Sequence, residues 1–298
     1  MRQTLLRLSR VEAAKDVARR GLRALAGFAK LKFRYNDIEV GMDFDPEPGL
    51  ADNGDLEGDL TSLLEQVGLA AKAAGTAVVI FIDELQYVEE AQLAALISAL
   101  HYCAQNQLPL TVVGAGLPQL RANTGKAKSY AERLFDFPTI GPLADPEAEL
   151  AIVKPATAAG VDFTPEAVAA IVSRTRGYPY FLQEWGKHTW AVAQQTLIVA
   201  TDVDIASIAA VAALDESFFR VRFDRLTPSE KTYLRAMAEL GAGPHRSGDI
   251  AEKLGKAVTS LGPIRNNLIS KGMIWSPSHG DTAFTVPLFD EFMKRIMP

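Results

Sequence analysis

The sequence has little cysteine and no long apolar run. Cys103 is the single cysteine among 298 residues, so no disulfide can form within the chain, which fits a reducing compartment. We expect Cys103 to be a packed, inert thiol rather than a reactive one, because free cysteines are usually buried. No apolar stretch approaches the roughly 20 residues of a membrane span, and the first residues lack the apolar core of a secretory signal. The sequence therefore predicts a cytoplasmic protein with no membrane contact.

The chain also lacks a strong excess of charge of one sign. It carries 31 Lys and Arg against 36 Asp and Glu, so contact with nucleic acid would have to be local. The arginine-rich residues 4–28 form an amphipathic helical pattern, for which a solvated helix face is favoured over a membrane helix or a nucleic-acid arm. Residues 30–35 and 37–42 alternate around Asn36 and predict a pair of strands.

The central part of the chain has the rhythm of a parallel α/β sheet. Residues 76–82 contain no polar side chain after Thr76, as in a strand buried on both faces of a parallel sheet. A helical pattern over 89–107 and a second apolar strand over 108–115 follow. After Pro142 the pattern becomes helical over 145–158, 164–175 and 178–194.

The last part of the chain has a separate pattern. Helices are predicted from Thr227 to Leu240, over 247–254, over 259–271 and over 288–296. Between the last two helices, residues 273–275 and 283–286 predict a hairpin. Three helices followed by a hairpin are typical of a winged helix-turn-helix. The sequence thus predicts three domains, at 1–142, 143–225 and 226–298.

Two adjacent carboxylates, Asp83 and Glu84, end the first apolar strand. Parallel α/β sheets bind ligands at the carboxyl ends of their strands. A carboxylate pair at this place is typical of a Walker B motif, in which one carboxylate holds Mg²⁺ and the other polarises a water. A strand that simply ends in a polar turn would look the same, so the pair alone leaves both interpretations open.

No G-x-x-x-x-G-K-[ST] phosphate loop occurs in the sequence. Residues 124–126 contain a Gly-Lys pair, but Leu120 stands in place of the first glycine and Ala127 in place of the serine or threonine. Without the backbone amides and the lysine of such a loop, most nucleotide affinity should be lost. Removing a central strand also leaves unpaired sheet edges. A truncated chain is therefore favoured, and a degenerate homologue is the alternative.

From about residue 55 onward the chain resembles the AAA+ ATPases, in particular the STAND and origin-recognition-like branch. The resemblance rests on Phe-Ile-Asp-Glu-Leu-Gln-Tyr at 81–87, Val-Gly-Ala-Gly-Leu-Pro-Gln at 113–119, Tyr-Ala-Glu-Arg-Leu-Phe at 130–135, Gly-Tyr-Pro at 177–179 and the winged-helix pattern. It implies an α/β fold with a parallel-sheet AAA+ core that is incomplete here, an all-α lid and a carboxy-terminal winged helix. It also implies ATP and Mg²⁺ as cofactors.

The resemblance implies roles for three residues of the core. Asp83 would ligate Mg²⁺ through water, and Glu84 would position the attacking water. Arg133 lies where an arginine finger would follow, and such a residue places positive charge against the transferring phosphate. An ion pair between Arg133 and a surface carboxylate is an equally weighted alternative.

The resemblance also implies a lid element. Gly177, Tyr178 and Pro179 match the G-x-P tripeptide whose backbone packs beside the nucleotide. An ordinary helix start would have the same residues. The chain departs from the family pattern at Gly114, where many relatives have a polar sensor, and at Tyr180, where origin-recognition relatives have an arginine.

The tail carries a mild basic bias, with nine Lys and Arg against seven Asp and Glu over residues 226–298. Arg and Asn suit guanine and adenine edges, and Lys suits phosphate. Candidate DNA-binding residues are Ser260, Arg265, Asn266 and Lys271 on the presumed recognition helix and His279 at the wing tip. A winged helix that contacts only protein is the alternative.

These observations predict an ATP-binding or ATPase switch module coupled to a winged helix. Because no phosphate loop is present, we expect the module to be inactive or to bind nucleotide weakly. Double-stranded DNA, further copies of the chain or another protein would be its partners. The alternative is a non-hydrolysing DNA-binding or protein-interaction scaffold with a regulatory role.

Overall fold

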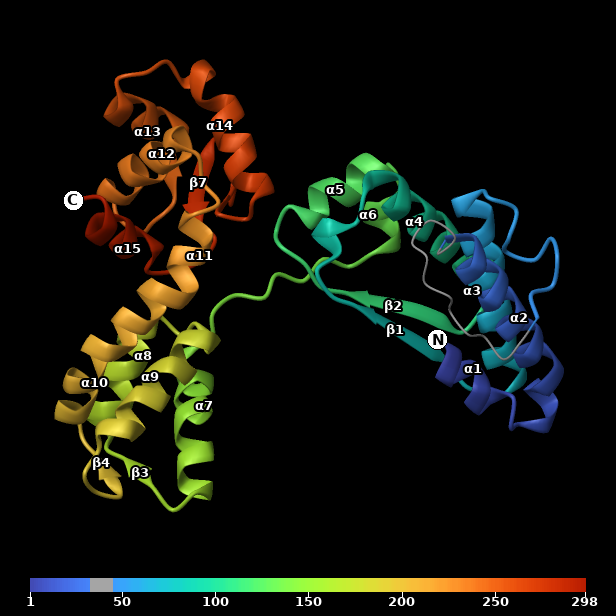
Figure 1. Cartoon of the computed structure of the whole chain (residues 1–298), viewed down its shortest axis with the longest axis horizontal. Helices are drawn as coiled ribbons and strands as arrows, with labels where there is room; N and C mark the ends of the chain where they lie inside the picture. Colours follow the sequence, from blue (N-terminus) through green and yellow to red (C-terminus); the bar gives the residue numbers. More distant parts are fainter. Residues whose placement is uncertain (33–44) are drawn as a thin grey trace. The chain divides into compact units, whose positions relative to one another are not determined.

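The computed structural model describes residues 1–32 and 45–298, which divide into two compact units. The first unit comprises residues 1–138 and the second residues 139–298. In Figure 1 the first unit runs from blue to green, and the second from green through yellow to red. Among the described residues, no helix is long and apolar enough to cross a membrane.

The first unit is built from helices that pack on a two-stranded parallel sheet (Figure 1). Strands β1 and β2 pair in register from Val78 with Leu110 to Ile82 with Gly114. Helix α4 makes the crossover between them, as the sequence predicts. The elements are α1 (Arg2–Leu8), the 3₁₀ turn η1 (Glu12–Ala14), α2 (Lys15–Lys32), α3 (Leu56–Ala73), β1 (Val78–Ile82), the 3₁₀ turn η3 (Leu85–Tyr87), α4 (Glu90–Gln105), β2 (Leu110–Gly114), α5 (Leu120–Ala127) and α6 (Ala131–Leu134).

The core of this unit lies on one face of the sheet. Leu64 of α3 and Cys103 of α4 pack with Leu108 and with the inward side chain of Ile80. Cys103 is fully buried, and this burial raises the pKa of its thiol to about 11. The prediction of a packed thiol is therefore confirmed, because so high a pKa keeps the sulfur protonated and unreactive at neutral pH.

The other face of the sheet is exposed in the part of the chain that the structure describes. Val79, Phe81 and Val113 have exposed fractions of 46%, 77% and 50%. The prediction that this strand is buried on both faces is wrong here. Within residues 1–32 and 45–138, β2 is the single strand paired with β1, and helices cover one face, so successive side chains alternate between core and solvent.

The amino-terminal segment differs from its prediction. Instead of one helix over 4–28, α1 and α2 are separated by η1, and both pack on α3 through a cluster that contains Leu5, Leu22 and Val67. Residues 30–32, predicted to begin a strand, belong to α2. The remainder of that predicted strand and its partner over 37–42 lie outside the described residues.

The second unit is mostly helical. It contains a short parallel pair, β3–β4, and an antiparallel sheet of order β5–β7–β6. Its elements are α7 (Asp145–Ala158), β3 (Asp162–Phe163), α8 (Pro165–Thr175), α9 (Pro179–Val192), β4 (Leu197–Ile198), α10 (Ala200–Ala213), the π-helical turn η4 (Leu214–Phe219), α11 (Arg220–Phe223), α12 (Pro228–Glu239), β5 (His245–Arg246), α13 (Ser247–Leu254), α14 (Val258–Ser270), β6 (Ile274–Trp275), β7 (Asp281–Phe284) and α15 (Phe289–Ile296).

The helices predicted from Thr227 onward are present, and the predicted hairpin is β6–β7. Strand β5 was not predicted, because two residues are too few to give a periodic signal. It extends the hairpin to three strands by pairing His245 with Thr282. Thr227 caps α12 by accepting from the amide of Glu230, as its position before proline suggests.

One hydrophobic core joins residues on both sides of position 225. Phe219 of η4 lies 5.7 Å from the ring centre of Phe289 and 5.3 Å from that of Phe292, both in α15. The ring of Phe181 in α9 also contacts that of Phe219, and their ring centres are 5.7 Å apart. The boundary near 226 stays a prediction, and the packing makes the helices before it and the tail after it one compact unit.

Candidate functional site

The carboxyl ends of β1 and β2 meet in two loops that are bonded to each other. The amide of Ala115 donates to the carbonyl of Ile82 at 2.9 Å, and the amide of Leu85 donates to the carbonyl of Ala115 at 3.0 Å. Asp83 and Glu84 lie between these bonds and are exposed. The parallel pairing thus places both carboxylates at the edge where α/β sheets present ligand-binding groups.

Glu84 has a strained backbone. Its φ of 57° and ψ of 36° lie in the left-handed region, which costs a residue with a side chain about 1–2 kcal/mol. Its amide donates to Oδ1 of Asp83 at 2.8 Å, so the two carboxylate residues are coupled directly. Strained residues of this kind cluster at functional sites, where the surrounding structure holds them in place.

Gln86 holds the carboxylate of Glu84 against the loop that follows β2. Its Nε2 donates to Oε2 of Glu84, and its Oε1 accepts from the amide of Leu117 at 3.1 Å. No sequence pattern singles out this side chain, although it lies within residues 81–87 of the Walker B resemblance. We assign it as the residue that positions Glu84, because one amide group contacts both loops.

The glycines of the second loop explain why the two loops approach so closely. A Cβ at Gly116 would lie 2.7 Å from Oε1 of Gln86, and one at Gly114 would lie 2.3 Å from Cδ1 of Leu85. The position at which the AAA+ resemblance implies a polar sensor is therefore filled by Leu85. The Gly-Ala-Gly sequence was the available signal for this contact, since glycine permits close approach of backbone.

The carboxylates fit part of a magnesium site. Mg²⁺ prefers oxygen ligands, keeps several waters and is commonly held by one or two carboxylates together with substrate phosphates. Asp83 and Glu84 supply such oxygens in an exposed position. Among the described residues no group of three or more His, Cys, Asp or Glu could enclose a metal, so a hydrated ion is the form that fits.

Residues 124–126 do not supply a phosphate cradle. They lie inside helix α5, where Thr124 is buried and donates its hydroxyl to the carbonyl of Arg121 at 2.9 Å. A cradle needs several amides that point into a loop, whereas amides inside a helix are bonded to its own carbonyls. Residues 124–126 therefore do not fit the phosphates of ATP, whereas Asp83 and Glu84 fit its metal.

Arg133 belongs to α6 in the same unit and is exposed. No carboxylate within the described ranges lies at ion-pair distance from its guanidinium, so the alternative of a surface ion pair has no partner there. Its role as an arginine finger stays a prediction.

The tripeptide Gly177, Tyr178 and Pro179 lies in the second unit and begins α9. Tyr178 is the residue before the helix, and Pro179 is its first residue, which fits the fixed φ of proline. Gly177 has a φ of +69°, and a Cβ there would lie 2.3 Å from the carbonyl oxygen of Leu143. The tripeptide thus forms a helix start that only glycine permits, and its contact with a nucleotide stays a prediction.

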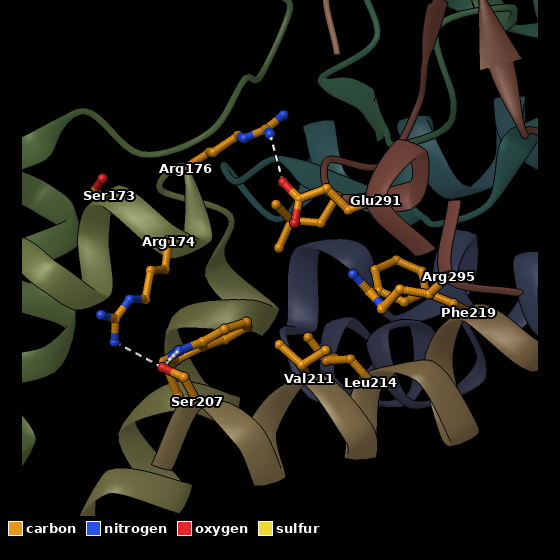
Figure 2. Close-up of a pocket in the computed structure, with 11 residues that line it drawn as sticks. Ser173, Arg174, Arg176, Ser207, Val211, Leu214, Phe219, Glu291 and Arg295 are labelled. Carbon is orange, nitrogen blue, oxygen red and sulfur yellow. Dashed lines mark hydrogen bonds and ion pairs between the residues drawn. The ribbon is translucent and has the colours of Figure 1, made fainter. Parts of the chain in front are cut away.

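A cavity of about 360 Å³ lies beside this helix start, within the second unit (Figure 2). Trp185, Leu214 and Phe219 form much of its apolar lining. In Figure 2 Arg176 and Glu291 point toward one another, and Arg174 points toward Ser207. Each of three arginines pairs with a carboxylate: Arg174 with Asp204, Arg176 with Glu291 and Arg295 with Asp215. The pair of Arg174 joins α8 to α10, whereas the pairs of Arg176 and Arg295 join the end of α8 and η4 to the last helix, α15.

The five predicted DNA-binding residues divide into two groups. Ser260, Asn266 and His279 are exposed. By contrast, the guanidinium of Arg265 donates to Thr282 and Ser276 of the hairpin at 3.0 and 2.9 Å. Arg265, one of the two predicted basic contacts to DNA, thus holds α14 against the hairpin.

The second basic group, Lys271, is engaged in the same way. Its ammonium donates to Oε2 of Glu230 at 2.7 Å and to the carbonyl of Arg225 at 3.0 Å. The carboxylate of Glu230 is 3% exposed. Burial raises the pKa of this carboxyl. The hydrogen bonds from Lys271 and Thr227 lower the pKa by more than burial raises it, so the pKa lies below its usual value. Lys271 therefore stabilises the start of α12.

Comparison with known proteins gives a fold and a domain model. Residues 216–293 match the model of a domain of unknown function, DUF8462. No curated protein matches the chain. The structure is similar to that of the Walker-type ATPase PABY2304 of Pyrococcus abyssi, with 17% identity, a TM-score of 0.57, and coverage of 79% of this chain and 68% of the other.

A weaker likeness is to the RuvB Holliday junction branch migration motor of Thermotoga maritima, with 18% identity, a TM-score of 0.40, and coverage of 79% of this chain and 81% of the other. The chain therefore shares the fold of the Pyrococcus ATPase.

Proposed function

We propose that the chain is a nucleotide-dependent switch module of the STAND and origin-recognition-like branch of the AAA+ ATPases. The observation that carries this proposal is the exposed carboxylate pair at the carboxyl end of β1. Gln86 bridges Glu84 to the loop after β2, and the backbone of Glu84 is strained. A polar turn with no further role would not need both features.

In this proposal each side chain of the pair has a separate role. Asp83 holds a hydrated Mg²⁺, which supplies positive charge to the phosphates of ATP when the nucleotide is bound. Glu84 accepts a hydrogen bond from the attacking water, and Gln86 keeps its carboxylate oriented. Arg133 contributes positive charge, in this copy or in a neighbouring copy of an oligomer.

The second unit supplies a connection between the lid and the tail. Arg176 immediately precedes Gly177 and pairs with Glu291 of α15 at 3.1 Å, while Phe219 packs on Phe289 and Phe292. A shift of the tripeptide on nucleotide binding would therefore act on α15. We propose that α12–α15 with the β5–β7–β6 sheet form a winged helix that reads out this shift.

The enzymatic part is tested by ATP turnover in a version extended upstream to include a phosphate loop. Glu84→Gln removes the group that orients water and should lower turnover about 100-fold or more. Glu90→Gln, an exposed glutamate a few residues away, is the matched control and should leave turnover unchanged. Absence of turnover in the extended protein, or full turnover in Glu84→Gln, would contradict the proposal.

Calorimetry of the present 298 residues with Mg·ATP addresses the phosphate loop separately. We expect no tight binding, because the sequence holds no phosphate loop. Tight binding that Asp83→Asn abolishes would show instead that other residues hold the phosphates.

A second candidate function is a non-hydrolysing DNA-binding or protein-interaction scaffold. The exposed polar side chains of Ser260 and Asn266 on α14, and of His279 in the hairpin turn, favour it. Duplex DNA titrated across a salt series should bind less tightly to Asn266→Ala/His279→Ala than to the unchanged chain. Equal binding of DNA by the two proteins would contradict a DNA-binding role for these residues and favour a tail that contacts only protein.

A further inference from the structure

Positive charge is concentrated at the amino-terminal end of the chain. Residues 1–29 contain seven Arg and Lys and two Asp and Glu, an excess of five positive charges. Since the whole chain has a net charge of −5, the remaining residues carry an excess of ten negative charges. So sharp an asymmetry marks the amino-terminal helices as the place where a negatively charged partner would contact this otherwise acidic chain.

Helix α2 separates its charged and apolar side chains onto opposite faces. Arg19, Arg20 and Arg23 are exposed, and their spacing of three and four residues places them on one face. Ala18 and Leu22 are buried in the cluster that joins α2 to α1 and α3. Packing of the apolar face fixes the orientation of α2, so its arginines face solvent.

Helix α1, which packs on α2, and the residues just after it carry two more exposed arginines. Leu5 of α1 packs directly on α2 at Gly21, where an added Cβ would lie 2.9 Å from Cδ2 of Leu5. Arg7, in the last turn of α1, and Arg10, just after it, are exposed. We define the basic surface as Arg7, Arg10, Arg19, Arg20 and Arg23 (Figure 1 shows α1 and α2).

Among the described residues, neighbouring carboxylates neutralise little of this charge. Within the described ranges, no carboxylate lies at ion-pair distance from Arg7, Arg10 or Arg19. Glu47 lies 3.2 Å from Arg20 and 3.7 Å from Arg23, and both arginines stay about half exposed. Exposed pairs of this kind contribute at most about 1 kcal/mol, so a phosphate could replace Glu47.

We propose that this basic surface binds the phosphate backbone of a nucleic acid. Arginine suits phosphate because its planar guanidinium donates two parallel hydrogen bonds. An anionic membrane is disfavoured, because a helix that lies in a bilayer surface inserts its apolar face, and that face of α2 is packed on α3. The proposal concerns the first unit and is independent of the function proposed for the tail.

The experiment measures binding of a short labelled DNA duplex of mixed sequence to the full chain, between about 50 and 200 mM salt. Arg7→Ala/Arg19→Ala removes two exposed charges from the basic surface. Each lost phosphate contact should lower the slope of log K against log salt by about 0.9, so the slope should fall by about 2 and low-salt affinity roughly tenfold or more.

Lys72→Ala/Lys126→Ala is the matched control, since it removes two exposed charges from the same unit outside the basic surface. It should leave the slope unchanged, and circular dichroism should show that both variants are folded. The proposal would be overturned by no binding of DNA to the full chain, by equal losses in these two variants, or by a loss confined to the tail variant Arg246→Ala/Lys256→Ala. Binding to vesicles of anionic lipid without binding to DNA would overturn it in favour of a membrane.

Discussion

The two units use similar apolar side chains in opposite ways. In the first unit, Phe81 of β1 is 77% exposed, although it lies in the most apolar strand of the chain. In the second unit, Phe219 is 1% exposed, and its ring contacts those of four other phenylalanines in α9, η4 and α15: Phe181, Phe218, Phe289 and Phe292. An apolar sequence therefore makes a core only where a second layer covers it.

The polar groups of the two units also differ. Asp83 and Glu84 are exposed and bonded to backbone or to Gln86, which leaves carboxylate oxygens available for a ligand. In the second unit, Arg265 and Lys271 are used to hold elements together. The first unit thus exposes polar groups that could bind a ligand, whereas many charged groups of the second unit make contacts within that unit.

The largest expected effect is loss of the aromatic contact in the second unit. Phe219→Ala removes a fully buried ring and leaves a cavity, so it should lower the free energy of unfolding by about 3–5 kcal/mol. Urea denaturation followed by circular dichroism, which reports on the helices of both units, measures this change. Phe81→Ala is the control in the first unit and should change stability by less than about 0.5 kcal/mol, because the ring is already in water. Similar losses of unfolding free energy from both substitutions would contradict the claim that the ring of Phe219 is buried and that of Phe81 is exposed.

The second effect concerns the buried ion pair of the tail. Glu230→Gln removes the charge that accepts from Lys271 and should lower the free energy of unfolding by about 1.5–3 kcal/mol at neutral pH. Because the pKa of Glu230 is lowered in the folded chain, its contribution is present above the unfolded pKa and is lost as pH falls through the folded pKa.

The difference between the unchanged chain and Glu230→Gln should therefore shrink when urea denaturation is repeated from about pH 7 down to about pH 3. A difference that stays constant over this range would show that the carboxylate makes no ionised contact in the folded state.

The smallest effect tests the strained backbone of the candidate site. Glycine adopts the left-handed region without a Cβ penalty, so Glu84→Gly should be more stable than Glu84→Ala by about 1 kcal/mol. Both variants lose the contact with Gln86, and chemical denaturation of the pair therefore isolates the backbone term. Equal stabilities, or a more stable alanine variant, would show that the backbone of residue 84 is not strained.

Much of the fold could be predicted from the sequence where local patterns are long. The strand–helix–strand order around Asp83 and Glu84 is correct, as are the helices and the hairpin from Thr227 onward. The exposure of Phe81 and the bridging role of Gln86 could not be predicted. Periodicity reports which residues are apolar, whereas exposure depends on which elements lie nearby.

The order of residues alone shows that two carboxylates end a predicted strand, that glycine occupies positions 114 and 177, and that basic charge gathers in residues 1–29. Tertiary structure decided what these residues do. Leu85 and Gln86 fill the space beside Gly114 and Gly116, Glu230 holds Lys271, and the packing of α2 on α3 turns its arginines outward. The physical reason is that chemistry and backbone preference are local properties, whereas a partner is supplied by residues that are distant in the chain.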